Sequence, residues 1–418
     1  MNAVLLLVGL LVLSYLGSFL VTGRTVRGAG LPSGVEYVAL GFVLGPKALD
    51  LVGGDMLASF EPVVQVALGW LAFGVGLDFG FAGERRGRVA SIALGSFASV
   101  LTGGAVAAAT WGVLRFLHVG ATTTDQLLLS GGLGAACAET TRHAVRWVVE
   151  RHNASGPLSD WLNELAHSDQ LLPLVAVSVL FALVPTEHVP MKMPLRDWPA
   201  ITAGLGLVLG CGAALLVRSE LKLDETWAVL FGVSLITIGT TARLALSTLT
   251  ACFFAGMAVA ALSRHGQELR AMVAPTERPV LLPALLLAGA HLDFQTTPRL
   301  AYIAAAAIGA RLAAKVVVGW VLLAVAKPAR AAGALVGLSL VSSGALAISI
   351  GLVFALRFPG LVGDTVLVVA AISATVGEFV GPARLKLTLT RAGEIHEGAG
   401  AGAGGTGGGA PTAQRAPA

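Results

Sequence analysis

The chain has 418 residues, of which 55% are hydrophobic and 12% charged, whereas roughly 25% of the residues in an average soluble domain are charged. Its mean hydropathy is +0.80, and its net charge of +4 is too small to favour a nucleic-acid partner. This composition excludes a soluble domain as the main body of the protein. It predicts an all-α, multi-pass membrane protein, because a helix satisfies its own backbone hydrogen bonds in lipid.

Thirteen apolar segments are long enough, or nearly so, to cross a bilayer, which takes about 20 helical residues. They cover roughly residues 3–22, 35–52, 60–80, 89–117, 125–150, 166–185, 199–217, 226–243, 246–262, 279–294, 299–325, 332–356 and 361–381. The first run is predicted to be a retained helix rather than a secretion signal, because no basic residue precedes Arg24. The Gly/Ala-rich segment 392–418 lacks apolar periodicity and is predicted to be a disordered cytoplasmic tail.

Basic residues are distributed unevenly between the two sides of this layout. With the N-terminus outside, the inner loops hold 17 Lys and Arg residues and the outer loops hold 7. Because positive residues concentrate in cytoplasmic loops, we expect the N-terminus outside and the C-terminus in the cytoplasm. The membrane is expected to be the inner (plasma) membrane of the cell.

Two halves of the chain share landmarks. Leu-Asp-Phe ends the third segment at 77–79 and the tenth at 292–294, and a proline follows four positions after both Asp169 and Glu378. The transmembrane domain 1–391 is therefore predicted to contain repeat one (1–185), a linker helix (186–222) and repeat two (223–391). An offset of seven crossings turns one half upside down. Such inverted six-helix repeats are typical of secondary transporters, whose site lies at the midplane beside broken helices.

The fifth segment contains Glu139, Thr140, Thr141, Arg142 and His143 in succession, and these side chains cannot all face lipid. A break in the helix here is tolerated only where protein or a wet cavity surrounds it. The carbonyl and hydroxyl oxygens of such a break are hard ligands that suit an alkali cation. Alternatively, Arg142 and His143 mark the inner end of the segment, with Arg142 as the charge partner of Glu139.

Asp169, at the start of the sixth segment, is the most informative residue of the chain, because an apolar run follows it directly. A carboxylate within a spanning helix costs at least ~2.5 kcal/mol and is by default functional. The alternative is that Asp169 caps the helix, for which Ser168 is the better candidate.

Two later segments carry possible partners. Arg311 and Lys315 lie four residues apart on one face of the eleventh segment, and Lys315 lies deep in the span. Asp169 is its first expected partner and Glu139 its second, unless the lysine extends to the membrane surface. The twelfth segment has Ser342 and Ser343 at a second expected break, although serines here also bond to their own helix.

In this order, the motifs of the chain resemble those of the bacterial monovalent cation:proton antiporters, which have the sodium/hydrogen exchanger fold. The resemblance extends to about residue 387 and rests on five short stretches. These are Pro32–Pro46, Leu68–Phe79, Ala255–Ala258, Leu282–Asp293 and Gly377–Pro382.

The resemblance implies roles for individual residues. The family's paired motif on the sixth helix falls on Ser168 and Asp169, its first broken helix on Thr140 and Thr141, and its eleventh-helix lysine on Lys315. Family members are usually dimers in which a core bundle slides against a dimerisation bundle. The chain departs from the family by having Ser168 in place of Asp or Asn and by the additional charges of Glu139 and Arg142.

We therefore predict exchange of Na⁺ or K⁺ for protons by alternating access, with Asp169 as the shared carboxylate. Thr140, Thr141, Ser168, Ser342, Ser343 and Glu139 are the predicted neighbours in the ion site, and Asp169, Ser168 and Thr140 are the predicted ligands of the transported cation. Lys315 and Arg142 are the predicted charge partners. The alternatives are a cation-coupled symporter that holds an organic anion on Arg142, or a membrane sensor that does not transport.

An enzyme is disfavoured, because the segments contain no nucleophile–base pair. The three scattered cysteines, Cys137, Cys211 and Cys252, give neither a disulfide framework nor a metal spacing, so no cofactor is expected. The expected partners are monovalent cations, protons, the lipid bilayer and a second copy of the chain.

Overall fold

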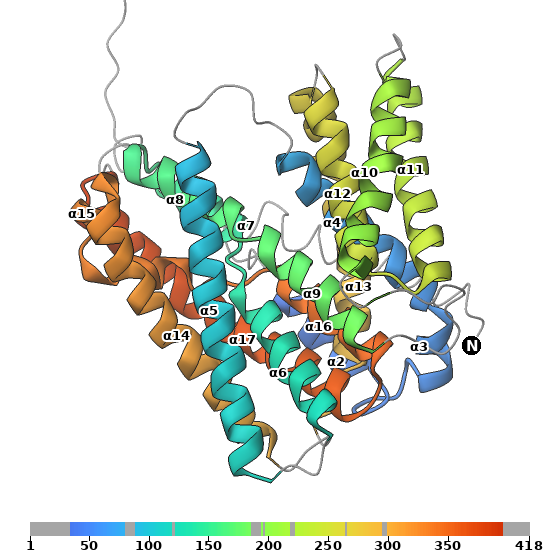
Figure 1. Cartoon of the computed structure of the whole chain (residues 1–418). Helices are drawn as coiled ribbons and strands as arrows, with labels where there is room; N and C mark the ends of the chain where they lie inside the picture. The colour runs from blue at the N-terminus through green and yellow to red at the C-terminus, as the bar shows by residue number, and fades with distance from the viewer. Residues whose placement is uncertain are drawn as a thin grey trace, which may run out of the picture.

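A computed structural model describes residues 34–79, 88–118, 122–184, 194, 197–217, 222–263, 266–294 and 299–395 (Figure 1). The described part is helical and contains no β-strand. The helices are α2 (Val35–Leu44), α3 (Gly54–Ser59), α4 (Glu61–Phe79), α5 (Arg88–Phe116), α6 (Thr123–Ala138), α7 (Arg142–Arg151), α8 (Pro157–Ser168), α9 (Leu171–Leu183), α10 (Asp197–Val217), α11 (Leu223–Leu244), α12 (Thr248–Leu262), α13 (Gly266–Ala290), α14 (Leu300–Val325), α15 (Lys327–Ala332), the 3₁₀ helix η1 (Ala334–Leu340), α16 (Ala345–Arg357) and α17 (Leu361–Arg391).

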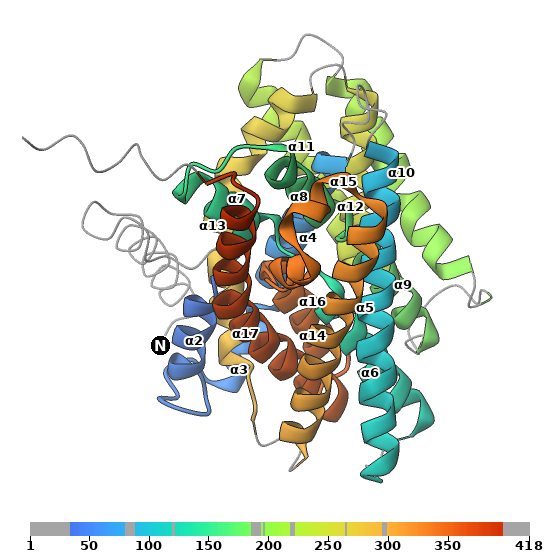
Figure 2. The same cartoon turned by 90° about the vertical axis from the view of Figure 1, so that its left-hand side faces the viewer.

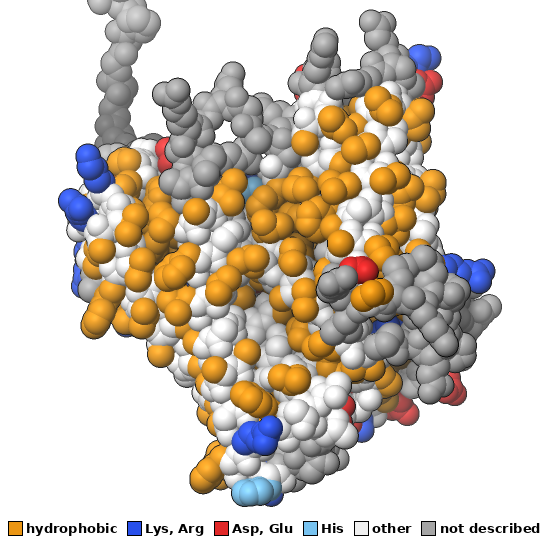
Figure 3. All heavy atoms as spheres, viewed as in Figure 1, with side chains coloured by type: hydrophobic (Ala, Val, Ile, Leu, Met, Phe, Trp, Pro, Cys, Tyr) orange, Lys and Arg blue, Asp and Glu red, His pale blue; other side chains and the backbone are white. Residues whose placement is uncertain are grey.

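The protein is an all-α multi-pass membrane protein, as predicted. Within the described residues, eight helical stretches are long and apolar enough to cross a bilayer, and α2, α12 and α16 are shorter apolar helices. Hydrophobic side chains cover much of the surface in Figure 3, while several of the charged ones gather toward its upper and lower ends. The predicted first span, 3–22, and residues 396–418 of the predicted tail lie outside the described residues.

Several predicted helix boundaries were wrong. The second segment was predicted to continue to residue 52, but α2 ends at Leu44, just before Gly45 and Pro46. The tenth was predicted to begin at Pro279, but α13 begins at Gly266 and runs through three prolines. Membrane helices tolerate proline where neighbouring helices cover the freed backbone groups, and α2 and α4 both pack on α13. Likewise, α17 runs ten residues beyond its predicted end at residue 381, passing through Pro382.

The helices pack as two groups (Figures 1 and 2). The core group comprises α5–α9 and α14–α17 with η1, and the flanking group comprises α2–α4 and α10–α13. Within the flanking group, α12 packs closely on α4 and α10, and within the core group α5 packs on α6 and α14. The two groups meet mainly where α9, α16 and α17 face α10, α12, α13 and α2. The predicted ion-site residues Glu139–Thr141, Ser168, Asp169, Lys315, Ser342 and Ser343 all lie on or between elements of the core group.

Two core segments are interrupted within their length, as predicted. The fifth segment is α6 followed by α7, with Glu139, Thr140 and Thr141 between them in extended or non-helical backbone. The twelfth is η1 followed by α16, with 341–344 between. The two interruptions touch, because the Thr141 N–H donates to the Ser342 carbonyl at 2.9 Å.

Helix contacts also follow the predicted repeat. The second, third, ninth and tenth segments are α2, α4, α12 and α13. If α2 corresponds to α12 and α4 to α13, the contact between α4 and α12 should have a counterpart between α13 and α2. Both pairs of helices pack closely. Each crossing is built on two glycines. A Cβ on Gly76 or Gly256 would meet the backbone of the facing helix, as would one on Gly41 or Gly289. The matching contacts of these two helix pairs support an inverted repeat, which stays a prediction.

Candidate ion site

Asp169 lies in a short gap between two helices of the core group. It follows the last residue of α8, and α9 begins two residues later. The residue is 2% exposed. Its Oδ1 accepts the Thr140 backbone N–H at 3.1 Å, and its Oδ2 lies 3.6 Å from Lys315 Nζ. Asp169 is thus the last residue of the α8 turn, because its N–H still donates to the Leu165 carbonyl, and it does not cap α9 through its side chain.

Lys315 enters the same place from α14. The side chain is fully buried, and Nζ donates to Thr140 Oγ1 at 2.7 Å. The Thr140 hydroxyl in turn donates to the Leu340 carbonyl at the end of η1, at 2.9 Å. An ammonium in the bilayer interior needs a partner, and Asp169 and Thr140 supply one from two other elements. Lys315 therefore does not extend to the membrane surface.

Glu139 connects the two interrupted segments. Its Oε2 accepts the N–H of Gly344, the residue before α16, at 3.0 Å. A carboxylate at a helix N-terminus is stabilised by the unpaired N–H groups and by the helix dipole. Its backbone carbonyl accepts Arg311 Nη2 at 2.9 Å. Glu139 thus has a structural contact with the second break, rather than the predicted contact with Arg142.

Arg311 is a second fully enclosed cation, one turn from Lys315 on α14. Its Nη1 donates to the Ser343 hydroxyl and, at 2.9 Å, to the Ser373 hydroxyl of α17. The sequence drew attention to Arg311 only through its spacing from Lys315, and Ser373 was not predicted. Two acids and two bases therefore converge from α6, the α8–α9 gap and α14, so their formal charges balance.

The remaining predicted residues have different positions. Thr141 and Ser342 meet through their backbones at the crossing, and Ser342 packs against Gly381 of α17. The Ser168 hydroxyl donates to the Glu164 carbonyl in its own helix at 2.8 Å. The contact directs the hydroxyl back along α8, so the geometry gives no support to Ser168 as a cation ligand. Sequence could not show this, because a serine has the choice between its own helix and a neighbour.

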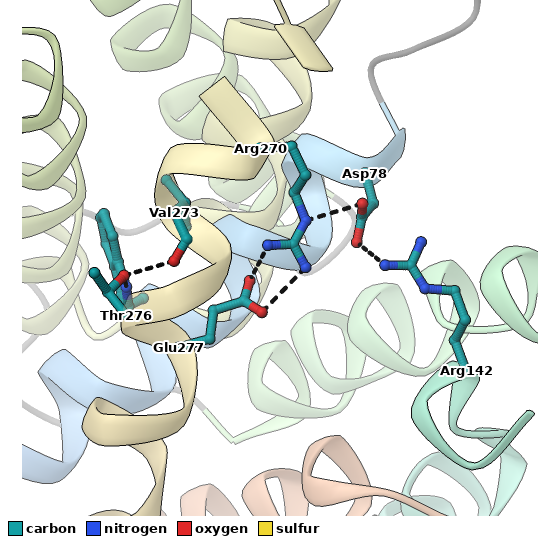
Figure 4. A network of polar contacts seen from close by, with 7 residues as sticks. Asp78, Arg142, Arg270, Val273, Thr276 and Glu277 are labelled. Carbon is teal, nitrogen blue, oxygen red and sulfur yellow. Dashed lines mark hydrogen bonds and ion pairs between the residues drawn. The ribbon is translucent and has the colours of Figure 1, made fainter. Parts of the chain in front are cut away.

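Arg142 was predicted beside Glu139 but points elsewhere. Its Nη2 donates to Asp78 Oδ2 on α4 at 2.7 Å, and Arg270 Nε on α13 donates to Asp78 Oδ1 at 2.9 Å (Figure 4). Arg270 also pairs with Glu277 on its own helix, at 2.8 Å. Arg142, which was predicted as a charge partner of the ion site, therefore pairs in this structure with Asp78, because the side chain at the start of α7 extends toward the flanking group.

Besides the two nitrogen donors that contact Asp169, several hydroxyl and carbonyl oxygens lie at the crossing of the interrupted segments. The Thr140 hydroxyl and the carbonyls of Glu139 and Leu340 lie at or beside the crossing. Among the described residues, no group of three His, Cys, Asp or Glu side chains is placed to hold a metal ion. An all-oxygen set with one carboxylate suits a transported alkali cation better than a tightly held transition metal.

Comparison with solved structures gives a match over nearly the whole chain. Two structures of the sodium proton antiporter from Methanocaldococcus jannaschii, one determined at pH 8 and one an electron-microscopy map, are each 14% identical to this chain. The first has a TM-score of 0.68 and covers 94% of this chain and 99% of its own; the second has a TM-score of 0.66, covering 94% and 98%. No family model and no curated protein matches the sequence. The chain therefore has the fold of a cation:proton antiporter.

Proposed function

We propose that the protein exchanges a monovalent cation, Na⁺ or K⁺, for protons across the membrane by alternating access, with Asp169 as the shared carboxylate. The observation that carries this proposal is the enclosed Asp169–Lys315 pair at the crossing of two interrupted helices. Such a pair is costly in a bilayer and contributes nothing that an apolar pair could not contribute to packing. The presence of this pair is explained if the Asp169 carboxylate has to exchange Lys315 for a cation or a proton during transport.

The geometry supports mutually exclusive binding. Lys315 Nζ and the Thr140 N–H hold the two oxygens of the Asp169 carboxylate at 3.6 and 3.1 Å. An incoming cation would take the place of the ammonium and gain Thr140 Oγ1 and nearby carbonyls as further ligands. A proton on Asp169 removes the negative charge that attracts the Lys315 ammonium and the transported cation. One carboxylate thus binds the cation or the proton, and this competition couples the two flows.

Two further observations bear on the proposal. The solved structures with this fold are of a sodium proton antiporter, which favours cation/proton exchange over a sensor that does not transport. The alternative of organic-anion symport required a free guanidinium at Arg142, and that group is held by Asp78. The homodimer implied by the resemblance, the inner-membrane location and the N-out orientation stay part of the proposal. Native mass spectrometry tests the dimer.

Vesicle transport tests the proposal directly. Purified protein in liposomes, with a pH-sensitive dye inside, is given pulses of Na⁺, K⁺ or Li⁺. We expect at least one cation to drive proton movement and Asp169→Asn to abolish it. Asp160→Asn serves as the matched control, because Asp160 is an exposed carboxylate in the first turn of the same helix, α8. Undiminished exchange in Asp169→Asn would refute the assignment.

A further inference from the structure

The core and flanking groups are held together differently at the two ends of α4. At the C-terminal end, the Arg142 guanidinium of the core group pairs with Asp78 of the flanking group, and His167 of α8 lies against Phe79 with ring centroids 4.3 Å apart. At the N-terminal end, a cavity of about 280 Å³ lies between the groups, and Arg357 Nη2 of the core group donates there to the Ala245 carbonyl of the flanking group at 3.3 Å. Asp78 and Glu61, which lines the cavity, are about 25 Å apart along α4 at 1.5 Å per residue.

The contact at Asp78 is enclosed and specific. The side chains of Asp78 and Arg142 are each 13% exposed. Arg270 fixes the other oxygen of the same carboxylate, and Glu277 fixes Arg270, so that Asp78 is held in place from within the flanking group before Arg142 reaches it (Figure 4). Of the ion pairs described in this network, the Arg142–Asp78 pair joins the two groups, whereas Arg270 and Glu277 both belong to α13.

Arg142 is also tied to the ion site through the chain itself. It is the first residue of α7, directly after the interruption at 139–141, and Thr140 lies two residues before it. Movement of the crossing relative to the flanking group therefore pulls on this pair. The cavity at the opposite end is lined by Phe181 and Arg357 of the core group and, from the flanking group, by apolar side chains together with Glu61, Gln65, Thr241 and Thr248. The oxygen atoms on the flanking side suit passage of a hydrated cation.

We propose that the Arg142–Asp78 ion pair is a gate between the two groups, closed in this structure, and that the cavity at the other end of α4 is the outer part of the entrance that leads toward the ion site. Under the predicted orientation, the gate is cytoplasmic and the cavity external. This inference rests on the proposed transport function, since a gate serves alternating access. Breaking the pair favours the arrangement that is open at the α7 end, whatever ion is carried.

Access to the site can be measured without transport. Ser168→Cys, introduced into a chain whose three natural cysteines are replaced by alanine, reports on the residue next to Asp169. Everted and right-side-out vesicles are treated with a membrane-impermeant thiosulfonate, and the same chain with Ser168 retained gives the background. Because Ser168 is 2% exposed, labelling from either face requires the protein to open. With the Arg142–Asp78 pair intact, labelling is expected to be slower from the α7 face than from the opposite face.

Arg142→Gln is expected to raise the labelling rate from the α7 face and to lower it from the opposite face, each on the order of tenfold, within the usual range of conformational coupling. Asp78→Asn should act in the same direction, and the double variant should add little, because both changes remove one interaction. Lys47→Gln is the control: it breaks an ion pair with Asp293 that lies within the flanking group and outside the Asp78 network, and it should leave both rates unchanged.

Unchanged rates in Arg142→Gln, or an equal increase in Lys47→Gln, would overturn the gate, since the first result shows no gating and the second shows a general loosening of the protein. The result is separate from that of the transport assay. A chain that moves no cation but shows opposite changes on the two faces would keep the gate and refute cation exchange. A chain that exchanges cations with unchanged labelling would do the reverse.

Discussion

At the scale of single residues, the central feature is a pair of opposite charges enclosed in the bilayer. Asp169 and Lys315 come from positions 146 residues apart in the chain, and both are almost completely buried. The sequence predicted this pair because each charge interrupts an apolar run and no nearer partner was available. It did not predict that the Thr140 hydroxyl joins them, since hydroxyl direction depends on the local backbone.

A double-mutant cycle tests the pair. Asp169→Asn and Lys315→Gln each leave one buried charge without its partner, which costs roughly 3–5 kcal/mol when a buried ion pair is broken. The double variant removes both charges and should recover a large part of that loss. Thermal unfolding of the purified protein in detergent measures the three variants. Additive losses would show that the two side chains do not interact in the folded protein.

At the scale of elements, the sequence predicted the existence of segments better than their ends. The interruptions at 139–141 and 341–344 followed from small and polar residues inside apolar runs, and both are present. The starts of α8 and α13 were missed, because hydropathy marks where a helix enters lipid rather than where it begins. Pro275, Pro279 and Pro283 are four residues apart inside α13, and a proline pattern alone argues against a helix there.

The predicted tail also begins differently. Glu394 was placed in a disordered segment, but it is 6% exposed, and its carboxylate accepts the N–H groups of Leu158 and Ser159 at 2.6 and 2.8 Å. These are the second and third residues of α8, whose N-cap position is Gly156, without a side chain to offer. A distant carboxylate thus caps the N-terminus of α8, the helix that ends immediately before Asp169. No local pattern contains such a contact.

Glu394→Gln is expected to lower the free energy of unfolding by about 1 kcal/mol, in the range for loss of a helix cap, because the neutral amide accepts these bonds more weakly. The melting temperature of the purified protein measures it. Glu150→Gln provides the comparison, as Glu150 is an exposed carboxylate near the end of α7. If both variants have the melting temperature of the wild-type protein, the Glu394 cap contributes nothing to stability.

At the scale of the whole molecule, the all-α fold and the crossing of two interrupted segments followed from composition, periodicity and repeat landmarks. The division into core and flanking groups was available only through the resemblance. The Asp78–Arg142–Arg270–Glu277 network was not predicted, because it joins helices from three distant parts of the chain. Arg270 had been assigned to a loop, so its charge carried no expected partner. Long-range ion pairs of this kind leave no mark in the spacing of residues.

The account depends on one carboxylate that holds either a cation or a proton. Calorimetric or dye measurement of protons released when Na⁺ or K⁺ is added to the purified, weakly buffered protein tests that claim without vesicles or gradients. We predict release of about one proton per bound cation at a pH where Asp169 is protonated, as linkage requires for a shared site. Asp169→Asn should release none. Proton release of the same size from Asp169→Asn, or cation binding without any release, would contradict the account.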